Sequence, residues 1–154
     1  MIAKQDLEKI KNKTEEFFNK AGIKVEINVS TPSEEVVDID LDIDEPQILI
    51  GEKGQTLVEI QRLLKMVLRR KIEKSFFINL DINDYKKKKA EHLKELVQSI
   101  ADDVALTKKQ RTLAPMLAYE RRIIHLELGE RSDVVTESVG EGIERRIVIK
   151  PNRS

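Results

Sequence analysis

The chain has 154 residues, a length that suits either one domain or two small units of about 70 to 80 residues each. Hydrophobic residues make up 40% of it and charged residues 36%, so enough apolar surface is present to form a core, and wholesale disorder is excluded. The absence of cysteine excludes disulfides, thiolate nucleophiles and cysteine-ligated zinc, and agrees with a reducing compartment.

The formal net charge is zero, but the charge is unevenly distributed. Residues 1–81 hold 13 Lys and Arg against 16 Asp and Glu, whereas residues 82–154 hold 15 against 12. A nucleic acid requires a local basic surface rather than a high overall pI, so the second half is the better candidate to bind one. The N-terminal residues are charged where a signal peptide or membrane span needs an apolar run. We therefore expect a cytoplasmic protein without membrane insertion.

The first half of the sequence opens with a helical pattern followed by two strand patterns. Residues 4–20 carry an apolar stripe at helical spacing, which predicts an amphipathic helix that ends at Gly22. Residues 23–29 and 37–43 alternate apolar with polar side chains, so each segment is predicted to form a half-buried strand. Residues 31–34 between them are typical of a turn.

A loop with two glycines follows. A brief apolar turn leads into residues 51–54, after which apolar residues keep helical spacing to about Arg70. Residues 76–80 alternate again and predict a third strand. The expected element order of the first half is α-β-β-α-α-β.

The second half begins with a long helix, for which Asn83 or Asp84 is the expected cap. Its first turn carries lysines at residues 86–89, where the helix dipole disfavours positive charge, so solvation or another role must account for them. A short strand at residues 111–114 and a helix at residues 116–128 follow.

The chain is predicted to end in a β-hairpin. Its strands are residues 134–138 and 143–150, and Gly140 and Gly142 supply the positive φ that the turn between them requires. The expected order of the second half is α-β-α-β-β. The whole sequence is therefore predicted to be an α+β protein of two small domains, residues 1–81 and 82–154, with the boundary near Asp81 to Asn83.

The loop at residues 51–54 has the composition of a phosphate-binding turn. Gly51 and Gly54 present no side chain and let a nucleic-acid backbone approach, while Lys53 supplies a positive charge. Gln55 is the next candidate contact. Alone, a Gly-x-x-Gly string is more often a tight turn before a helix. Glu52 and the acids that precede the loop should weaken phosphate binding, so this module binds weakly or serves as a docking surface.

In its α-β-β-α-α-β context, ILIGEKGQTLVEIQRLL resembles the signature of a KH domain of the bacterial, type II order. The resemblance implies that about four nucleotides are held between the loop and an adjacent apolar groove. Gln61, Arg62 and Lys65 on the following helix are candidates for the groove edge.

The helix at residues 116–128 carries a second candidate site. Arg121 and His125 are four residues apart, so they lie on one helix face, with Arg122 beside them. An arginine offers a planar charged fork for phosphate, and a histidine ring stacks on a base and bonds the arginine or a phosphate. On spacing alone, such a pair is more often an ordinary feature of a helix surface.

The segment APMLAYERRIIHLELGERSDVVTESVGEGIERRIVIKP closely resembles the R-three-H domain, a single-stranded nucleic-acid-binding module named for its Arg-x-x-x-His motif. The motif falls on Arg121 and His125, and the resemblance extends into the hairpin. Arg145 and Arg146 are predicted to point to opposite faces of a strand, so at most one of them joins the binding surface, and Arg145 is favoured.

A KH unit followed directly by an R-three-H unit resembles the bacterial Jag family over nearly the whole chain. The resemblance implies single-stranded RNA binding and post-transcriptional control, with single-stranded DNA as an alternative ligand and a small KH-domain protein as a further partner. Many members carry another N-terminal domain, whereas this sequence starts at the KH helix, so we expect no envelope-linked role.

Two other classes of function were weighed against RNA binding. An enzyme is not expected, because no metal-ligand spacing, nucleotide-binding glycine loop or organised pair of carboxylates is present, and neither a metal nor another cofactor is predicted. A protein-interaction adaptor with little RNA affinity is the stronger rival. It predicts partner binding that persists at high salt, whereas contacts to phosphate weaken as salt rises.

Overall fold

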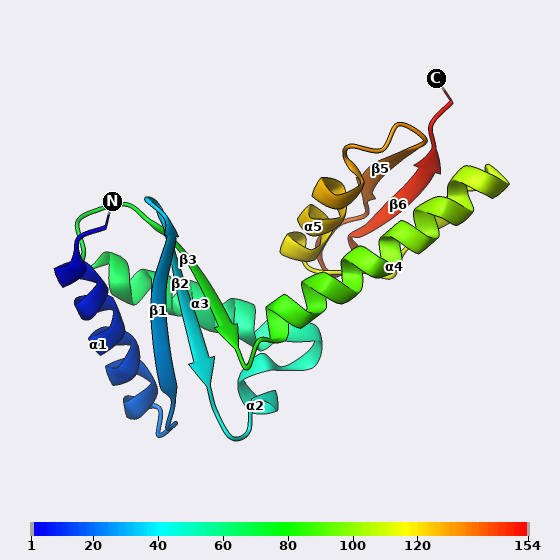
Figure 1. Ribbon diagram of the computed structural model, residues 1–154. Helices are drawn as coiled ribbons and strands as arrows, with labels where there is room; N and C mark the ends of the chain where they lie inside the picture. The colour runs from blue at the N-terminus through cyan, green and yellow to red at the C-terminus, as the bar shows by residue number, and fades with distance from the viewer. Residues whose placement is uncertain (1, 154) are drawn as a thin grey trace. The chain divides into compact units, whose positions relative to one another are not determined.

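In the computed structural model, which describes residues 2–153, the chain divides after Lys86 into two units that each have a hydrophobic core (Figure 1). The elements of the first unit are α1 (Lys4–Lys20), β1 (Glu26–Ser33), β2 (Val36–Asp42), α2 (Gln47–Ile50), the 3-10 turn η1 (Glu52–Gly54), α3 (Gln55–Arg69) and β3 (Phe77–Ile82). The predicted order α-β-β-α-α-β is therefore confirmed.

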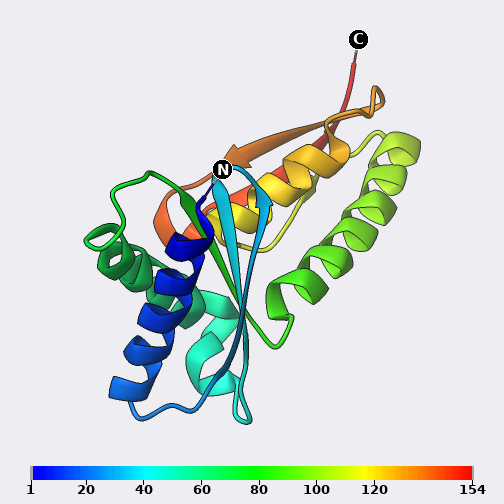
Figure 2. The same cartoon turned by 60° about the vertical axis from the view of Figure 1, so that its left-hand side comes forward.

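The first unit is a helical layer packed on a three-stranded sheet in the order β1-β2-β3. β1 and β2 are antiparallel, with Ile27 opposite Leu41, whereas β2 and β3 are parallel, with Ile39 opposite Leu80. These apolar side chains face α1 and α3, which cover one face of the sheet (Figures 1 and 2). The helix α1 buries Ile10, Thr14 and Phe18, as its predicted stripe requires.

The opposite face of this sheet is acidic. Glu26 and Asp42 are paired across β1 and β2, and Asp38 and Asp40 lie on the same face of β2, because side chains alternate along a strand. Helices α1 and α3 therefore cover only the apolar face of this sheet, and within residues 2–86 the acidic face carries no such helical layer.

The predicted turn at residues 31–34 is wrong. β1 begins at Glu26 rather than Ile23 and continues through Pro32, and the chain reverses at residues 34–35. The strand pairing shifts register between Ser30 and Ser33. Such an irregularity tolerates a proline, because the residue that lacks an N–H donor does not have to pair.

The second unit contains most of α4 (Tyr85–Thr107), then β4 (Arg111–Thr112), α5 (Ala118–Leu128), β5 (Val134–Val139), the 3-10 turn η2 (Gly142–Glu144) and β6 (Arg146–Pro151). The order α-β-α-β-β and the α+β class are as predicted. The sheet has the antiparallel order β4-β6-β5, and its Ile147 and Ile149 share a core with Val97 of α4 and Ile124 of α5.

Two element boundaries in this unit differ from the prediction. α5 begins at Ala118 rather than residue 116, and the last strand begins at Arg146 rather than residue 143, because the turn η2 occupies the interval. The predicted role of the glycines is confirmed, since Gly140 and Gly142 have φ of +85° and +54°.

The start of α4 is held differently from the expected cap. The side chain of Asn83 donates to the carbonyl of Ile43 and accepts from its amide, at 2.9 and 3.0 Å. The amide of Lys86 instead donates to Oδ1 of Asp81, at 2.8 Å. Of the two predicted caps, Asn83 is therefore wrong, because its side chain bonds Ile43 and the Asp81 carboxylate near the end of β3 accepts the Lys86 amide, while the cap at Asp84 stays a prediction. No helix in residues 2–153 combines the length and apolar character needed to cross a membrane.

Candidate nucleic-acid interface

The helix α5 places Arg121 and His125 on the side that packs against β5. Nη1 of Arg121 donates to the carbonyl of Met116, at 2.7 Å, and Nδ1 of His125 lies 2.6 Å from Oγ1 of Thr136 on β5. The two side chains are half-buried. The histidine therefore bonds a strand hydroxyl rather than Arg121, and this contact fixes its ring while leaving Nε2 outside the hydrogen bond.

A polar strip continues along β5 from this contact. Thr136 and Ser138 lie on the same face of the strand, two residues apart. Oγ of Ser138 is buried and makes no hydrogen bond within residues 2–153. Buried hydroxyls usually form a hydrogen bond within the protein. The hydroxyl of Ser138 is therefore an exception, which an ordinary contact between a helix and a strand does not require.

The hairpin contributes Arg145 through a chain of hydrogen bonds. The amide of Met116 donates to the carbonyl of Arg145, at 3.1 Å, and the carbonyl of Met116 accepts from Arg121. Nη1 of Arg145 in turn donates to the carbonyl of Gly140, at 2.8 Å, which closes the hairpin turn. Arg121 and Arg145, which are 24 residues apart in sequence, thus both bond to Met116, Arg121 through its side chain and Arg145 through its backbone carbonyl.

The prediction for the two hairpin arginines is wrong in one respect. Arg145 precedes β6, so the alternation of side chains along a strand does not govern it. Nε of Arg146 donates to the carbonyl of Glu144, and its Nη2 lies 2.8 Å from the Glu144 carboxylate. Because Arg146 is paired with an acid, Arg145 remains the better candidate for a phosphate contact. Arg122 is exposed on α5.

The first turn of α5 rests on a buried carboxylate that the sequence did not single out. Glu120 is 3% exposed, and its Oε2 accepts from the amide of Leu117, at 2.8 Å. Its Oε1 lies 3.3 Å from Nζ of Lys89 on α4. The acidic side chain therefore caps α5 and ties it to α4, which positions the Arg121 turn.

This pairing explains part of the lysine run. Lys89 forms an ion pair with Glu120. Nζ of Lys86 donates to Oε1 of Gln61, at 2.7 Å, and to Oδ1 of Asn79, at 3.3 Å. Burial lowers the pKa of Lys86 to about 8, although the charge of Asp81 opposes this shift. Lys86 and Lys89 therefore have structural partners, so simple solvation does not account for the whole run.

The loop between α2 and α3 has left-handed backbone at three positions. Gly51, Lys53 and Gly54 have φ of +73°, +53° and +80°. A Cβ on Gly51 would lie 2.0 Å from Oγ1 of Thr56, and one on Gly54 would lie 2.9 Å from the ring of Tyr85. Both glycines are therefore required by backbone conformation and internal packing before any ligand is considered.

The exposed side chains of this loop have opposite charges. Glu52 and Lys53 are exposed, and Nε2 of the Gln55 side chain donates to Oε1 of Glu59, at 3.2 Å. Nη1 of Arg62 binds the same carboxylate oxygen, at 2.9 Å. Gly51, Lys53, Gly54 and Gln55 thus lie in one turn, where the neighbouring Glu52 offsets the charge of Lys53.

The residues predicted for the groove edge have local partners. Oε1 of Gln61 accepts from the amide of Leu80, at 2.9 Å, as well as from Lys86, so Gln61 supports the sheet. Nζ of Lys65 lies 5.6 Å from the ring centre of Phe77, a cation–π distance. The side-chain oxygen of Gln61 is therefore already used twice, and its place at the groove edge stays a prediction.

The fold also gathers three carboxylates that are scattered in sequence. Ligand atoms of Asp40, Asp81 and Asp84 lie within 4.8 Å of one another. Asp81 accepts from the amides of Ile82 and Lys86, so one member already organises the start of α4. Spacing along the chain gave no signal for this cluster, because parallel pairing of β2 with β3 creates it.

Comparisons with known proteins agree with the position of the second candidate site. The family profile of the R-three-H domain matches residues 91–151. RNA-binding protein KhpB of Clostridium symbiosum is 36% identical over 140 residues, which are 90% of this chain and 63% of that protein. RNA-binding protein KhpB of Bacillus subtilis is 37% identical over 108 residues, 69% of this chain and 52% of the relative. The chain therefore spans less than two thirds of the length of these curated relatives.

Proposed function

Since the chain belongs to the Jag family, whose curated relatives are named RNA-binding protein KhpB, we propose that it binds single-stranded RNA and acts as a post-transcriptional regulator. Single-stranded DNA is the alternative ligand. The protein acts in the cytoplasm by binding rather than by catalysis, and a small KH-domain protein is a candidate partner.

The observation that carries this proposal is the arrangement around Met116. Its carbonyl accepts from the side chain of Arg121 and its amide donates to the backbone carbonyl of Arg145, and His125 lies one turn along the same helix as Arg121. Guanidinium groups bind phosphate oxygens through paired donors, and an imidazole ring stacks on bases. With exposed Arg122, these groups form a surface suited to a single strand whose bases are unpaired.

We assign the contacts to two modules, a KH-like domain at residues 1–81 and an R-three-H domain at residues 82–154. The proposed nucleic-acid-binding residues are Gly51, Lys53, Gly54, Gln55, Arg121, Arg122, His125 and Arg145. The second module carries most of the affinity, because Glu52 and Glu59 oppose a phosphate at the first loop. Two weak sites on one chain raise affinity through effective concentration when a strand reaches both.

The experiment is binding of a fluorescent single-stranded RNA to the full chain over a salt series. Arg121→Ala and His125→Ala test the second module, and Lys53→Gly tests the first. Arg111→Ala is the matched control, since it removes one charge from the same unit at a residue paired with Asp103. We expect Arg121→Ala to lower affinity about tenfold or more, while Arg111→Ala changes it little.

The salt series separates phosphate contacts from other causes. Each phosphate contact to a single strand contributes roughly 0.7 to the slope of log affinity against log salt, so Arg121→Ala should also reduce that slope. Absence of RNA binding by the folded wild-type chain, or equal losses in Arg121→Ala and Arg111→Ala, would overturn the proposed site. Equal affinity for RNA and DNA of one sequence would remove the preference for RNA.

A further inference from the structure

The first unit has an open groove between α1 and α3 that the proposed RNA contacts do not use. Its volume is about 640 Å³. The floor consists of Phe17 from α1 and Leu63, Met66 and Val67 from α3. Leu63, Met66 and Val67 are three or four residues apart, so the apolar strip runs along α3, with Phe17 of α1 at its side.

The exposure of this floor is unusual for a helix that is already packed. α3 buries Leu57, Leu64 and Leu68 against the sheet, yet Leu63 is 53% exposed and Met66 is 66% exposed. Val67 is 38% exposed beside them. A contiguous apolar patch with a polar rim marks an interaction surface, whereas single exposed apolar residues do not. A methionine in the patch also adapts to partners of different shape.

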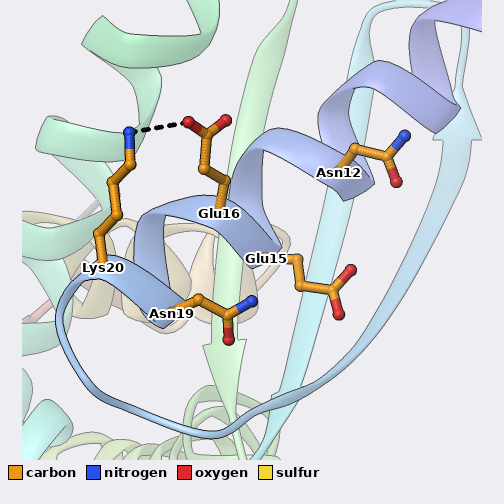
Figure 3. A pocket seen from close by; sticks show the side chains of 5 residues that line it. All are labelled: Asn12, Glu15, Glu16, Asn19 and Lys20. Atoms are coloured by element: carbon orange, nitrogen blue, oxygen red, sulfur yellow. Dashed lines mark hydrogen bonds and ion pairs between the residues drawn. The ribbon is translucent and has the colours of Figure 1, made fainter.

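The rim of the groove is positive. Lys13 and Lys20 border it on α1, and Arg70 and Lys71 border it at the end of α3. The one acid in the lining, Glu16, is held by both α1 lysines, at 2.5 Å from Lys13 and 2.8 Å from Lys20 (Figure 3 shows the second contact). These hydrogen bonds lower the pKa of Glu16 to about 2, so it stays ionised and internally compensated.

We propose that the α1–α3 groove binds an amphipathic helix of a partner protein, with apolar side chains on one face and Asp or Glu on both flanks. A helix lying between two helices fills such a strip with residues at i, i+3 or i+4, and i+7. Four cations against one acid in the lining select acidic flanks. Arg70 and Lys71 lie at the C-terminal end of α3, where the helix dipole contributes roughly half a negative charge, so their two positive charges outweigh it.

Two other occupants fit less well. A second copy of the chain would bring an equally positive rim against this one, and like charges across an interface cost affinity. A single-stranded nucleic acid would find three aliphatic side chains and one half-buried ring, Phe17, rather than a platform of exposed aromatic rings on which successive bases stack. The shallow hollow on the outer side of α1, which Asn12, Glu15 and Asn19 line, has no apolar floor and offers no comparable surface (Figure 3).

The test uses two designed peptides of about 18 residues, roughly five helical turns, with blocked ends and leucines along one face. One carries glutamates on both flanks and the other carries lysines at the same positions. Binding to the full-length chain is measured by fluorescence anisotropy and by mapping shifts of backbone amide resonances. We expect the acidic peptide to bind about tenfold or more tightly than the basic one, with the shifts confined to α1 and α3.

Substitutions in the protein locate the binding. Met66→Asp should weaken the acidic peptide about tenfold or more, and Lys71→Glu should weaken it while improving the basic peptide. Leu106→Asp is the matched control, because Leu106 is 84% exposed in the second unit. Thermal unfolding of each variant checks that the fold is retained, and Leu63→Ser gives a milder change if Met66→Asp unfolds.

Other results would overturn the inference. Equal binding of both peptides, or an acidic peptide that binds Met66→Asp as well as wild type, excludes an acid-selective groove. A dimer in light scattering that Met66→Asp dissociates identifies a second copy as the occupant. RNA affinity that falls in Met66→Asp but not in Leu106→Asp assigns the groove to nucleic acid, and the RNA-binding proposal would then stand without this one.

Discussion

Nζ of Lys89 lies 3.3 Å from Oε1 of Glu120, a carboxylate that is 3% exposed although it belongs to the first turn of a surface helix. Glu120→Ala removes both this ion pair and the acceptor of the Leu117 amide. We expect a loss of about 2 to 4 kcal/mol in the free energy of unfolding, since breaking a buried pair leaves an uncompensated charge, here partly solvated. Urea unfolding measures it.

Glu120→Gln is the matched variant for that measurement. It keeps an acceptor for the amide of Leu117 but loses the charge that attracts Lys89. A loss clearly smaller than that of Glu120→Ala would separate the cap from the ion pair. Should both variants retain wild-type stability, Glu120 does not hold α5 in place.

The contact between His125 and Thr136 predicts a positioning role for the hydroxyl. Thr136→Val removes the partner of Nδ1 while keeping the shape of the side chain. A hydrogen bond of this kind contributes about 1 kcal/mol, so RNA affinity should fall roughly fivefold. Thr136→Ser should restore it, because serine supplies the same oxygen. Anisotropy measures affinity, and urea unfolding shows whether stability changes with it.

A merely structural role of Thr136 gives a different pattern. In that case, Thr136→Val lowers the free energy of unfolding while the RNA affinity of the folded fraction stays at the wild-type value.

The loop of the first unit predicts different results for a glycine and for the lysine beside it. Gly54→Ala forces a side chain to φ of +80° and against Tyr85, so we expect a loss of stability of about 1 to 3 kcal/mol. Lys53→Gly relieves the positive φ of a side-chain-bearing residue, so its stability should stay within about 1 kcal/mol of wild type. Thermal unfolding of the two variants gives the comparison.

Only Lys53→Gly then reports on RNA at this loop. A loss of affinity in this variant, at unchanged stability, supports a phosphate contact by Lys53. Unchanged affinity leaves the first module without a working loop contact.

Lys86 predicts a pH dependence of stability in a defined window. Burial lowers its pKa to about 8 from 10.5, so between these values the unfolded state binds more protons than the folded state. The free energy of unfolding therefore rises as pH increases from about 8 to 10.5, because the folded chain loses its Lys86 proton first. Below about pH 8, Lys86 is protonated in both states, and the full cost of burying its charge lowers stability. Relative to Lys86→Met, the wild-type chain should gain stability from pH 7 to pH 10 in urea unfolding. A constant difference would refute the buried position of the ammonium.

The sequence predicted the element types well because most segments are strongly periodic. The helix at residues 4–20 was predicted with its observed bounds, and the pairing of Arg121 with His125 on one face follows from their spacing. Local patterns failed where a distant residue decides the structure. Asp81 caps α4 only because β3 ends beside it, and Arg145 joins Arg121 only through the backbone of Met116. Neither contact leaves a periodic signal.

The acidic face of the first sheet has a consequence for how the whole chain responds to electrolyte. Glu26, Asp38, Asp40 and Asp42 repel a polyanion that approaches from that side, and added salt screens repulsion as well as attraction. Rising ionic strength therefore weakens the attraction between RNA phosphates and the arginines of the second unit. It also weakens the repulsion between RNA phosphates and the acidic face of the first unit. The net salt slope of the intact chain should then be shallower than the slope of a chain in which these four acids are replaced by Asn and Gln.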